Sequence, residues 1–137
     1  MRNLKESQKN GHVVRKIQIN GSDGTREISQ YHYLAWPDHG VPSETQTLNF
    51  LLTDLKAEEA KENGPIAVHC SAGVGRTGTL IALSILHGII AEQKKRGVDI
   101  GISVFSVVRR LREQRIMMVQ SEEQYQLLYN FVAEWTS

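Results

Sequence analysis

A glycine-rich loop after a short apolar run is the feature that most constrains the fold of this chain. The run Ile66–His69 contains two β-branched residues and leads directly into Cys70, the only cysteine in the sequence. Three glycines follow within eight positions, and Arg76 opens a long segment with apolar residues at helical spacing. A strand, a loop and a helix in this order make an anion-binding site, because loop N–H groups and the positive end of the helix dipole converge.

Cys70 stands at the base of this loop, where its thiol is expected to ionise readily. Loop amides, a Ser or Thr hydroxyl, the helix dipole and the fixed charge of Arg76 all favour the thiolate. A thiolate below a phosphate-sized ring of donors can attack phosphorus, while a planar guanidinium holds two phosphate oxygens. The alternative for a lone cysteine is a buried thiol at the end of a strand. The glycines in the same frame favour the reactive interpretation.

A second loop, Trp36–Pro42, contains two prolines and a glycine, which excludes a helix and a regular strand. Asp38 follows one of these prolines. A phosphate ester with a poor leaving group needs a proton donor, and a carboxylic acid can supply the proton. The alternative is an ordinary turn with an aspartate cap. Beside the cysteine loop, the proton donor is the favoured interpretation.

Three segments resemble one known family. The segment His69–Gly78 resembles the signature loop of the cysteine-dependent protein tyrosine phosphatases, in their phosphotyrosine-specific branch. Trp36–Pro42 resembles the mobile general-acid loop of that family, which implies that Asp38 is the acid. The segment 114–125 is similar to the glutamine loop, which implies that Gln120 positions the hydrolytic water with Gln124 nearby. The residues alone favour a surface amide at Gln120, and the resemblance reverses that interpretation.

The resemblance implies hydrolysis of phosphotyrosine monoesters in peptides or proteins through a cysteinyl-phosphate. Cys70 would attack phosphorus, Arg76 would hold the phosphate oxygens, and Asp38 would act first as acid and then as base. Thr77 would stabilise the departing thiolate and His69 would orient the loop. The residues implied in binding phosphate, or an oxyanion such as vanadate, are Ser71, Ala72, Gly73, Val74, Gly75, Arg76 and Gln124. No metal and no cofactor is required, because arginine and amides supply the positive charge.

Composition and spacing argue against several other classes. A net charge of +1 does not indicate a nucleic-acid or membrane-surface partner. One cysteine cannot form an internal disulfide, and a thiolate nucleophile needs a reducing compartment, so a cytoplasmic protein is expected. The N-terminus lacks a signal-peptide core, and no stretch approaches the roughly 20 apolar residues of a membrane span. The scattered histidines do not give zinc spacing, and a nucleotide-binding loop needs a lysine where Arg76 stands.

The predicted fold is α/β: a single phosphatase domain over residues 1–137, with a twisted mixed sheet flanked by helices on both faces. Ile66–His69 is predicted as its central strand. Strands at 13–19 and 27–35 are expected to form an antiparallel hairpin, and residues 1–12 are expected to be disordered at their start. The expected helices span 43–64, with a capping box at Ser43 and Gln46, and 77–95, 103–115 and 121–135.

The resemblance extends over about residues 13–135 and corresponds to the C-terminal half or so of the family's catalytic domain. The upstream tyrosine-bearing loop that sandwiches the phosphotyrosine ring has no counterpart, and Lys9–His12 is a poor match to it. Selectivity for tyrosine therefore stays open, as does the choice between a compact enzyme and a fragment. A weak phosphate- or phosphotyrosine-binding module and a rhodanese-like sulfur carrier are the alternatives. The intact loop around Asp38 argues against both.

Overall fold

The structure is a computed structural model that describes residues 1–61 and 64–137. Its internal packing divides the chain into two compact units. The first unit comprises Met1–Trp36 and Pro42–Pro65, and the second comprises Pro37–Val41 and Ile66–Ser137. The single domain predicted from the sequence therefore consists of two separately packed parts, and their union into one domain stays a prediction.

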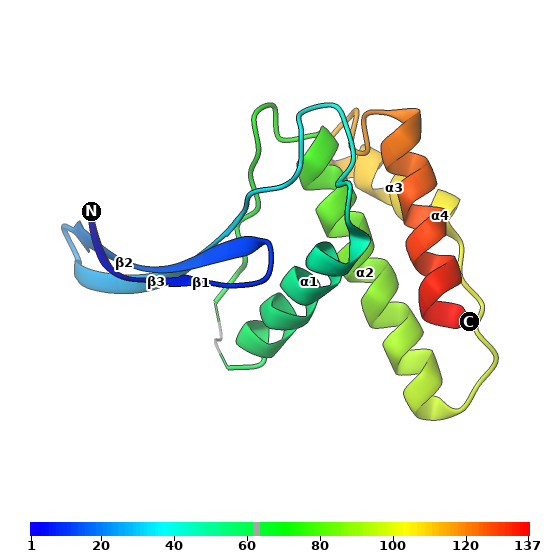
Figure 1. The fold of residues 1–137 in the computed structure, drawn as a ribbon, viewed down its shortest axis with the longest axis horizontal. Coiled ribbons are helices and arrows are strands. Elements are labelled where there is room, and N and C mark those ends of the chain that lie inside the picture. The colour runs from blue at the N-terminus through cyan, green and yellow to red at the C-terminus, as the bar shows by residue number, and fades with distance from the viewer. Residues whose placement is uncertain (62–63) are drawn as a thin grey trace. The chain divides into compact units, whose positions relative to one another are not determined.

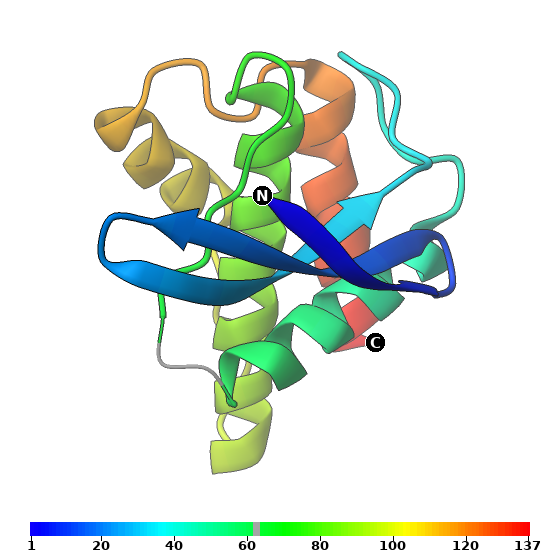
Figure 2. The same cartoon turned by 90° about the vertical axis from the view of Figure 1, so that its left-hand side faces the viewer.

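The first unit contains a three-stranded antiparallel sheet in the order β1-β2-β3 and one helix, α1 (Figure 1). The bounds of these elements are β1 Arg2–Gln8, β2 His12–Gly21, β3 Gly24–Tyr33 and α1 Thr45–Glu59. Figure 2 shows the three strands side by side. Strands β2 and β3 pair from His12 with Tyr33 to Gly21 with Gly24, so the turn falls where the polar run between them predicted it. The predicted antiparallel hairpin is confirmed.

Side-chain contacts join the sheet of the first unit to α1. The Tyr33 hydroxyl lies 2.6 Å from Oγ1 of Thr47, and Nε2 of His12 lies 3.0 Å from Oδ2 of Asp54. Trp36 packs edge-on against Tyr33, with ring centroids 6.3 Å apart. The buried apolar residues of this unit are Val13, Ile17, Leu48, Leu51 and Leu52. Their burial supplies the main stabilisation of a unit whose outer strand β1 is almost entirely exposed.

The second unit contains helices α2 (Gly75–Arg96), α3 (Val104–Gln114) and α4 (Glu122–Thr136), and both α3 and α4 contact α2. Its buried apolar residues are Ala82, Leu83, Leu86, Ile90, Val104, Val108, Leu111, Met118, Val119, Leu127, Leu128 and Phe131. The N-caps predicted at Ser103 and Ser121 are confirmed, because each hydroxyl accepts a backbone N–H three residues later. None of the helices within the described ranges has the length and apolar character needed to cross a membrane.

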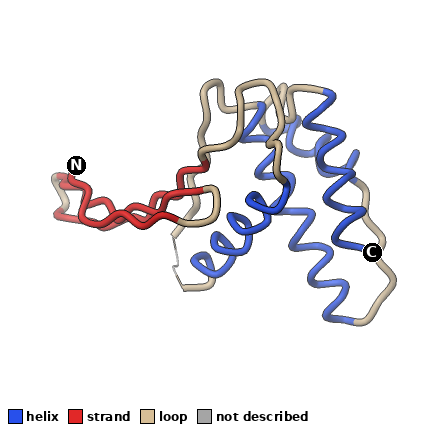
Figure 3. Tube along the Cα trace, viewed as in Figure 1, coloured by secondary structure: helices blue, strands red, loops and turns tan. Residues whose placement is uncertain are grey.

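The predicted sheet is wrong in its pairing. All described strands belong to one antiparallel sheet, so the sheet is not mixed, and Ile66–His69 is not a strand in it (Figure 3). A strand is defined by its hydrogen-bonded neighbours, and the three described strands pair only with one another. Ile66 is also 49% exposed, whereas a residue of a central strand would be buried. The start of residues 1–12, predicted to be disordered, instead forms strand β1. Pairing with β2 satisfies the backbone hydrogen-bonding groups of this polar segment.

The bounds of α1 also differ from the prediction. The helix begins at Thr45 with Glu44 as its N-cap and no side-chain cap hydrogen bond, so the capping box at Ser43 and Gln46 is wrong. Its last residue is Glu59, with Ala60 as the C-cap, rather than a residue next to Gly64. Part of the predicted helix, residues 62–63, lies outside the described residues.

Candidate active site

The Cys70 sulfur lies at the start of the second unit's longest helix and accepts several hydrogen bonds. The Thr77 hydroxyl donates to Sγ at 3.0 Å, and the backbone N–H of Gly73 donates at 3.3 Å. Thr77 is buried in the first turn of α2, so its hydroxyl is held in place by the helix. Gly73 has φ +74°, a left-handed conformation that glycine adopts at little cost.

These contacts change the acidity of the thiol. Burial raises the pKa of Cys70. Hydrogen bonds from the side chain and backbone of Thr77 and from the N–H groups of Gly73 and Val74 lower the pKa, and together they outweigh the effect of burial. The net result is a pKa of about 7, below the ordinary 9.0. About half of the thiol is therefore ionised at neutral pH. Cys70 is a half-exposed, low-pKa cysteine, which is the environment of reactive rather than structural thiols.

Arg76 and Asp38 meet in the same unit although they are distant in sequence. Nη2 of Arg76 lies 3.2 Å from Oδ1 of Asp38, with the arginine side chain 25% exposed and the aspartate side chain 53% exposed. The backbone N–H of His39 also donates to Oδ1 of Asp38 at 3.2 Å. His39 has φ +60°, an uncommon conformation for a residue other than glycine. The structure thus brings the predicted acid to the predicted phosphate-binding guanidinium.

Gln124 connects three predicted site segments. Its Oε1 accepts the backbone N–H groups of Gln120 at 3.0 Å and Ser121 at 3.3 Å. Its Nε2 donates to the carbonyl of Gly40 at 3.2 Å, so the amide reaches the segment that carries the predicted acid. A Cβ added to Gly75 would stand 2.9 Å from Oε1 of Gln120 and 3.2 Å from Nε2 of Gln124. Only glycine at that position lets both amides approach the cysteine loop closely.

The segment before Gln120 is tied to the same loop through backbone contacts. The Val74 carbonyl accepts the N–H of Val119 at 3.0 Å and that of Gly78 at 3.1 Å. Val119 has φ +61°, which is strained for a β-branched residue. Arg112 supports this turn by donating to the carbonyls of Met118 at 2.9 Å and Val119 at 2.7 Å. Hydrogen bonds from Val119 to Val74 and from Arg112 thus hold the strained Val119 in place, directly before the predicted site residue Gln120.

The structure gives Arg115 and Gly78 structural roles that the sequence did not assign to them. Arg115 Nη2 donates to the carbonyl of Ala72 at 3.2 Å and lies 3.3 Å from a Cβ added at Gly73, so this guanidinium braces the loop. Gly78 lets the turn at Val119 pack onto α2, because an added Cβ would stand 2.5 Å from the Val119 nitrogen. A glycine inside a strongly apolar helix is the signal that indicates such a close approach.

Among the described residues, the side chains of two predicted site residues make no contacts that would support their predicted roles. His69 and Ser71 are exposed, and their side chains have no hydrogen bond to the other residues that the structure describes. The orienting role of His69 and the phosphate contact of Ser71 stay predictions. Within the described ranges, no three His, Cys, Asp or Glu side chains are grouped as metal ligands would be.

The arrangement combines a low-pKa thiol, a helix start without a side-chain cap, a guanidinium and a carboxyl group. Together these groups have the chemistry that cysteine-based phosphoryl transfer needs.

Comparison with known proteins agrees with this class. The chain matches the family model for protein-tyrosine phosphatase over residues 1–134, and it belongs to that family. Human receptor-type tyrosine-protein phosphatase H is 46% identical over 110 residues, covering 79% of this chain and 9% of that protein. Mouse tyrosine-protein phosphatase non-receptor type 18 is 37% identical over 131 residues, covering 95% of this chain and 28% of that protein. Tyrosine-protein phosphatase corkscrew of Drosophila virilis is 35% identical over 139 residues, covering 96% of this chain and 18% of that protein.

Proposed function

We propose that this chain carries the catalytic groups of a protein tyrosine phosphatase, which hydrolyses phosphotyrosine in peptide or protein substrates through a cysteinyl-phosphate. The observation that carries the proposal is the Cys70 sulfur, which accepts hydrogen bonds from Thr77 and Gly73 and has a pKa of about 7. The chain spans at most 28% of the length of the relatives named above, so the activity is proposed from the site residues.

In the first half of the proposed reaction, the Cys70 thiolate attacks phosphorus as the bond to the tyrosine oxygen breaks. Arg76 and the loop N–H groups hold the equatorial oxygens and stabilise the developing charge. Asp38 gives its proton to the departing phenolate oxygen. Because Asp38 pairs with Arg76 at 3.2 Å, a bound phosphate would take over the guanidinium and free the carboxyl group for this role.

In the second half, water attacks phosphorus, the sulfur–phosphorus bond breaks, and the water proton passes to the Asp38 carboxylate. We place Gln120 on this water, because its amide lies beside the loop at Gly75. Thr77 stabilises the departing thiolate with the hydrogen bond that it already makes to Sγ. Gln124 positions both amide and acid through its contacts with Gln120 and Gly40.

We further infer that both units belong to one catalytic domain, with a twisted sheet covered by helices on both faces. The family match supports this inference, because it runs without interruption across both units. We place the protein in the cytoplasm, where a reducing environment maintains a free thiolate. The relatives include one protein named as non-receptor and one named as receptor-type. We infer that the substrates are phosphotyrosine proteins and that vanadate-type oxyanions are ligands.

A phosphotyrosine peptide assay on the wild type and Cys70→Ser tests the proposal. We expect Cys70→Ser to lower turnover by about 10³-fold or more, because a hydroxyl in place of the thiolate is far less nucleophilic. A mass increase of one phosphoryl group, trapped on the wild type by acid quenching, would identify the intermediate. Equal turnover by both proteins would contradict the proposal. Phosphopeptide binding without any turnover by the wild type would favour the phosphate-binding module instead.

A further inference from the structure

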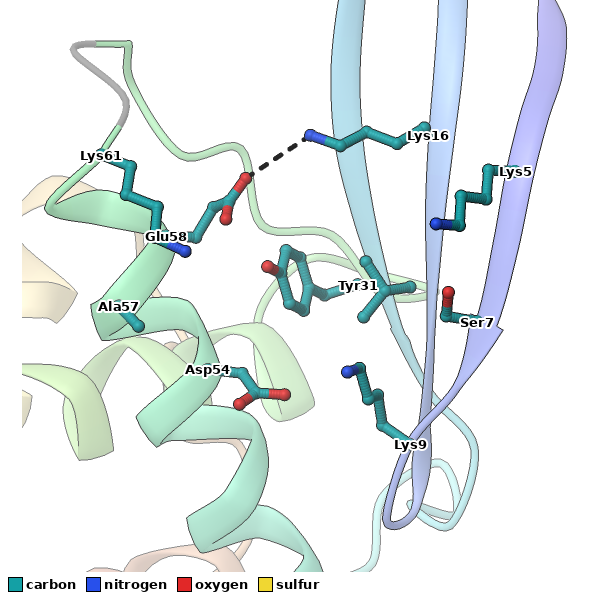
Figure 4. A pocket seen from close by; sticks show the side chains of 10 residues that line it. Lys5, Ser7, Lys9, Lys16, Tyr31, Asp54, Ala57, Glu58 and Lys61 are labelled. Atoms are coloured by element: carbon teal, nitrogen blue, oxygen red, sulfur yellow. Dashed lines mark ion pairs between the residues drawn. The ribbon is translucent and has the colours of Figure 1, made fainter.

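A cavity in the first unit lies between the sheet and α1, and lysines dominate its lining (Figure 4). Its volume is about 320 Å³. The residues that line it are Lys5, Ser7, Lys9, Val14, Lys16, Tyr31, Asp54, Ala57, Glu58 and Lys61. None of these residues belongs to the cysteine loop or to the segment that carries the predicted acid.

The two carboxylates in the lining already have partners. Asp54 pairs with His12 at 3.0 Å, and Glu58 accepts a hydrogen bond from Ser29 at 3.0 Å and lies 3.7 Å from Nζ of Lys16. The other three lysines, Lys5, Lys9 and Lys61, form no ion pair with any residue in the described part of the chain. The lining therefore holds four ammonium groups against two carboxylates, although the whole chain has a net charge of only +1.

The unpaired ammonium groups come from both walls of the cavity. In Figure 4, the side chains of Lys5 and Lys9 extend from the sheet side toward α1. Lys61 lies on the opposite side, in the turn that follows α1. Tyr31 stands between these walls with its hydroxyl toward α1. Burial, the charges of Glu58 and Asp54, and a hydrogen bond to Glu58 raise the pKa of Tyr31, so the protonated phenol gives Glu58 a further partner.

We propose that this cavity binds a small polyanion with two or more phosphate groups, either free or as the headgroup of a lipid. Ammonium groups of like charge repel one another in a partly enclosed space, and a polyanion between them would offset that repulsion. Lysines on opposite walls suit several phosphates on one scaffold better than a single phosphate, because each ammonium is a separate point charge. This proposal does not depend on the proposed function, because it uses none of the residues of the cysteine loop.

The test measures binding of inositol trisphosphate by titration calorimetry. Iodoacetamide first blocks the cysteine loop, which is selective because Cys70 is the only cysteine. The test variant is Lys9→Gln/Lys61→Gln, and the matched control is Lys56→Gln/Lys95→Gln, which removes the same charge from exposed lysines outside the lining. We expect a single site whose Kd rises about tenfold or more in the test variant and stays within about twofold in the control.

Further measurements separate the source of the ligand. Co-sedimentation with phosphatidylcholine vesicles, with and without phosphatidylinositol bisphosphate, shows whether the headgroup is bound in a membrane, and the calorimetry shows whether the free form is bound. Binding of either form that the test variant loses supports the proposal. Absence of binding to both, an equal loss in the control variant, or inorganic phosphate that binds as tightly as inositol trisphosphate would overturn it. If circular dichroism shows that the double variant does not fold, Lys9→Glu and Lys56→Glu replace the pair.

Discussion

The cysteine loop and the segment that carries Asp38 belong to the same unit but are held in different ways. Behind the cysteine loop, Thr77 and Thr79 in α2 are at most 5% exposed, and the Val74 carbonyl accepts two backbone N–H groups. Asp38 is 53% exposed, and its segment is tied to the rest of the unit through Arg76 and through the Gly40 carbonyl. This difference fits the proposed roles, because a nucleophile gains from being held in place before the substrate arrives, whereas an acid on a mobile loop has to approach and withdraw in each cycle.

Removing the acid without touching the cysteine loop would sharpen this comparison most. We expect Asp38→Asn to lower kcat by about 10²–10⁴-fold on a phosphotyrosine peptide, because an amide cannot donate the proton that the leaving oxygen needs. Vanadate inhibition should not weaken, since Cys70 and Arg76 remain. The measurements are steady-state kinetics and a vanadate inhibition constant. Asp23→Asn, in an exposed turn, is the control and should match the wild type. Unchanged kcat in Asp38→Asn would remove the acid role.

We expect a larger side chain at Gly78, behind the cysteine loop, to lower the stability of the fold rather than to impair proton donation by Asp38. A Cβ at residue 78 would stand 2.5 Å from the Val119 nitrogen and 3.0 Å from the Met118 Cα, so the backbone has to move. We expect Gly78→Ala to lower the free energy of unfolding by about 2 kcal/mol, a roughly 30-fold change in the unfolding equilibrium, after the gain in helix propensity is included. Urea unfolding measures this. Gly101→Ala is the control, because a Cβ added there would have no atom within 4 Å. Its free energy of unfolding should stay within about 0.5 kcal/mol of the wild type.

Removing one hydrogen bond from the sulfur should have the smallest effect. We expect Thr77→Val to raise the pKa of Cys70 from about 7 toward the ordinary 9.0, because the thiolate loses its side-chain donor at 3.0 Å. Since only the thiolate reacts, iodoacetamide alkylation at pH 7 should slow roughly fivefold, with little change well above pH 9. The rate as a function of pH gives the midpoint directly. Thr53→Val, an exposed threonine on α1, is the control. An unmoved midpoint would show that backbone donors alone set the acidity.

The features predicted well from the sequence depend on short-range chemistry. The caps at Ser103 and Ser121 and the turn between β2 and β3 follow from side chains and backbone within a few residues of each other. The failures involve partners at a distance. Ile66–His69 has the composition of a strand, yet no described strand pairs with it, and the polar β1 is a strand because β2 lies beside it.

The candidate site divides in the same way. Cys70, Arg76 and Thr77 are close together along one loop and helix start, so the sequence by itself indicated the proposed nucleophile, the proposed phosphate-binding guanidinium and the donor to the sulfur. Only the tertiary structure decided that Gln124 reaches Gly40, that Asp38 meets Arg76, and that Gly78 accommodates the turn at Val119. The same holds for the lysines around the cavity of the first unit, which come from two strands, the loop between them and the turn after α1. These contacts join residues far apart in the chain, and local propensity contains no information about which distant groups packing will bring together.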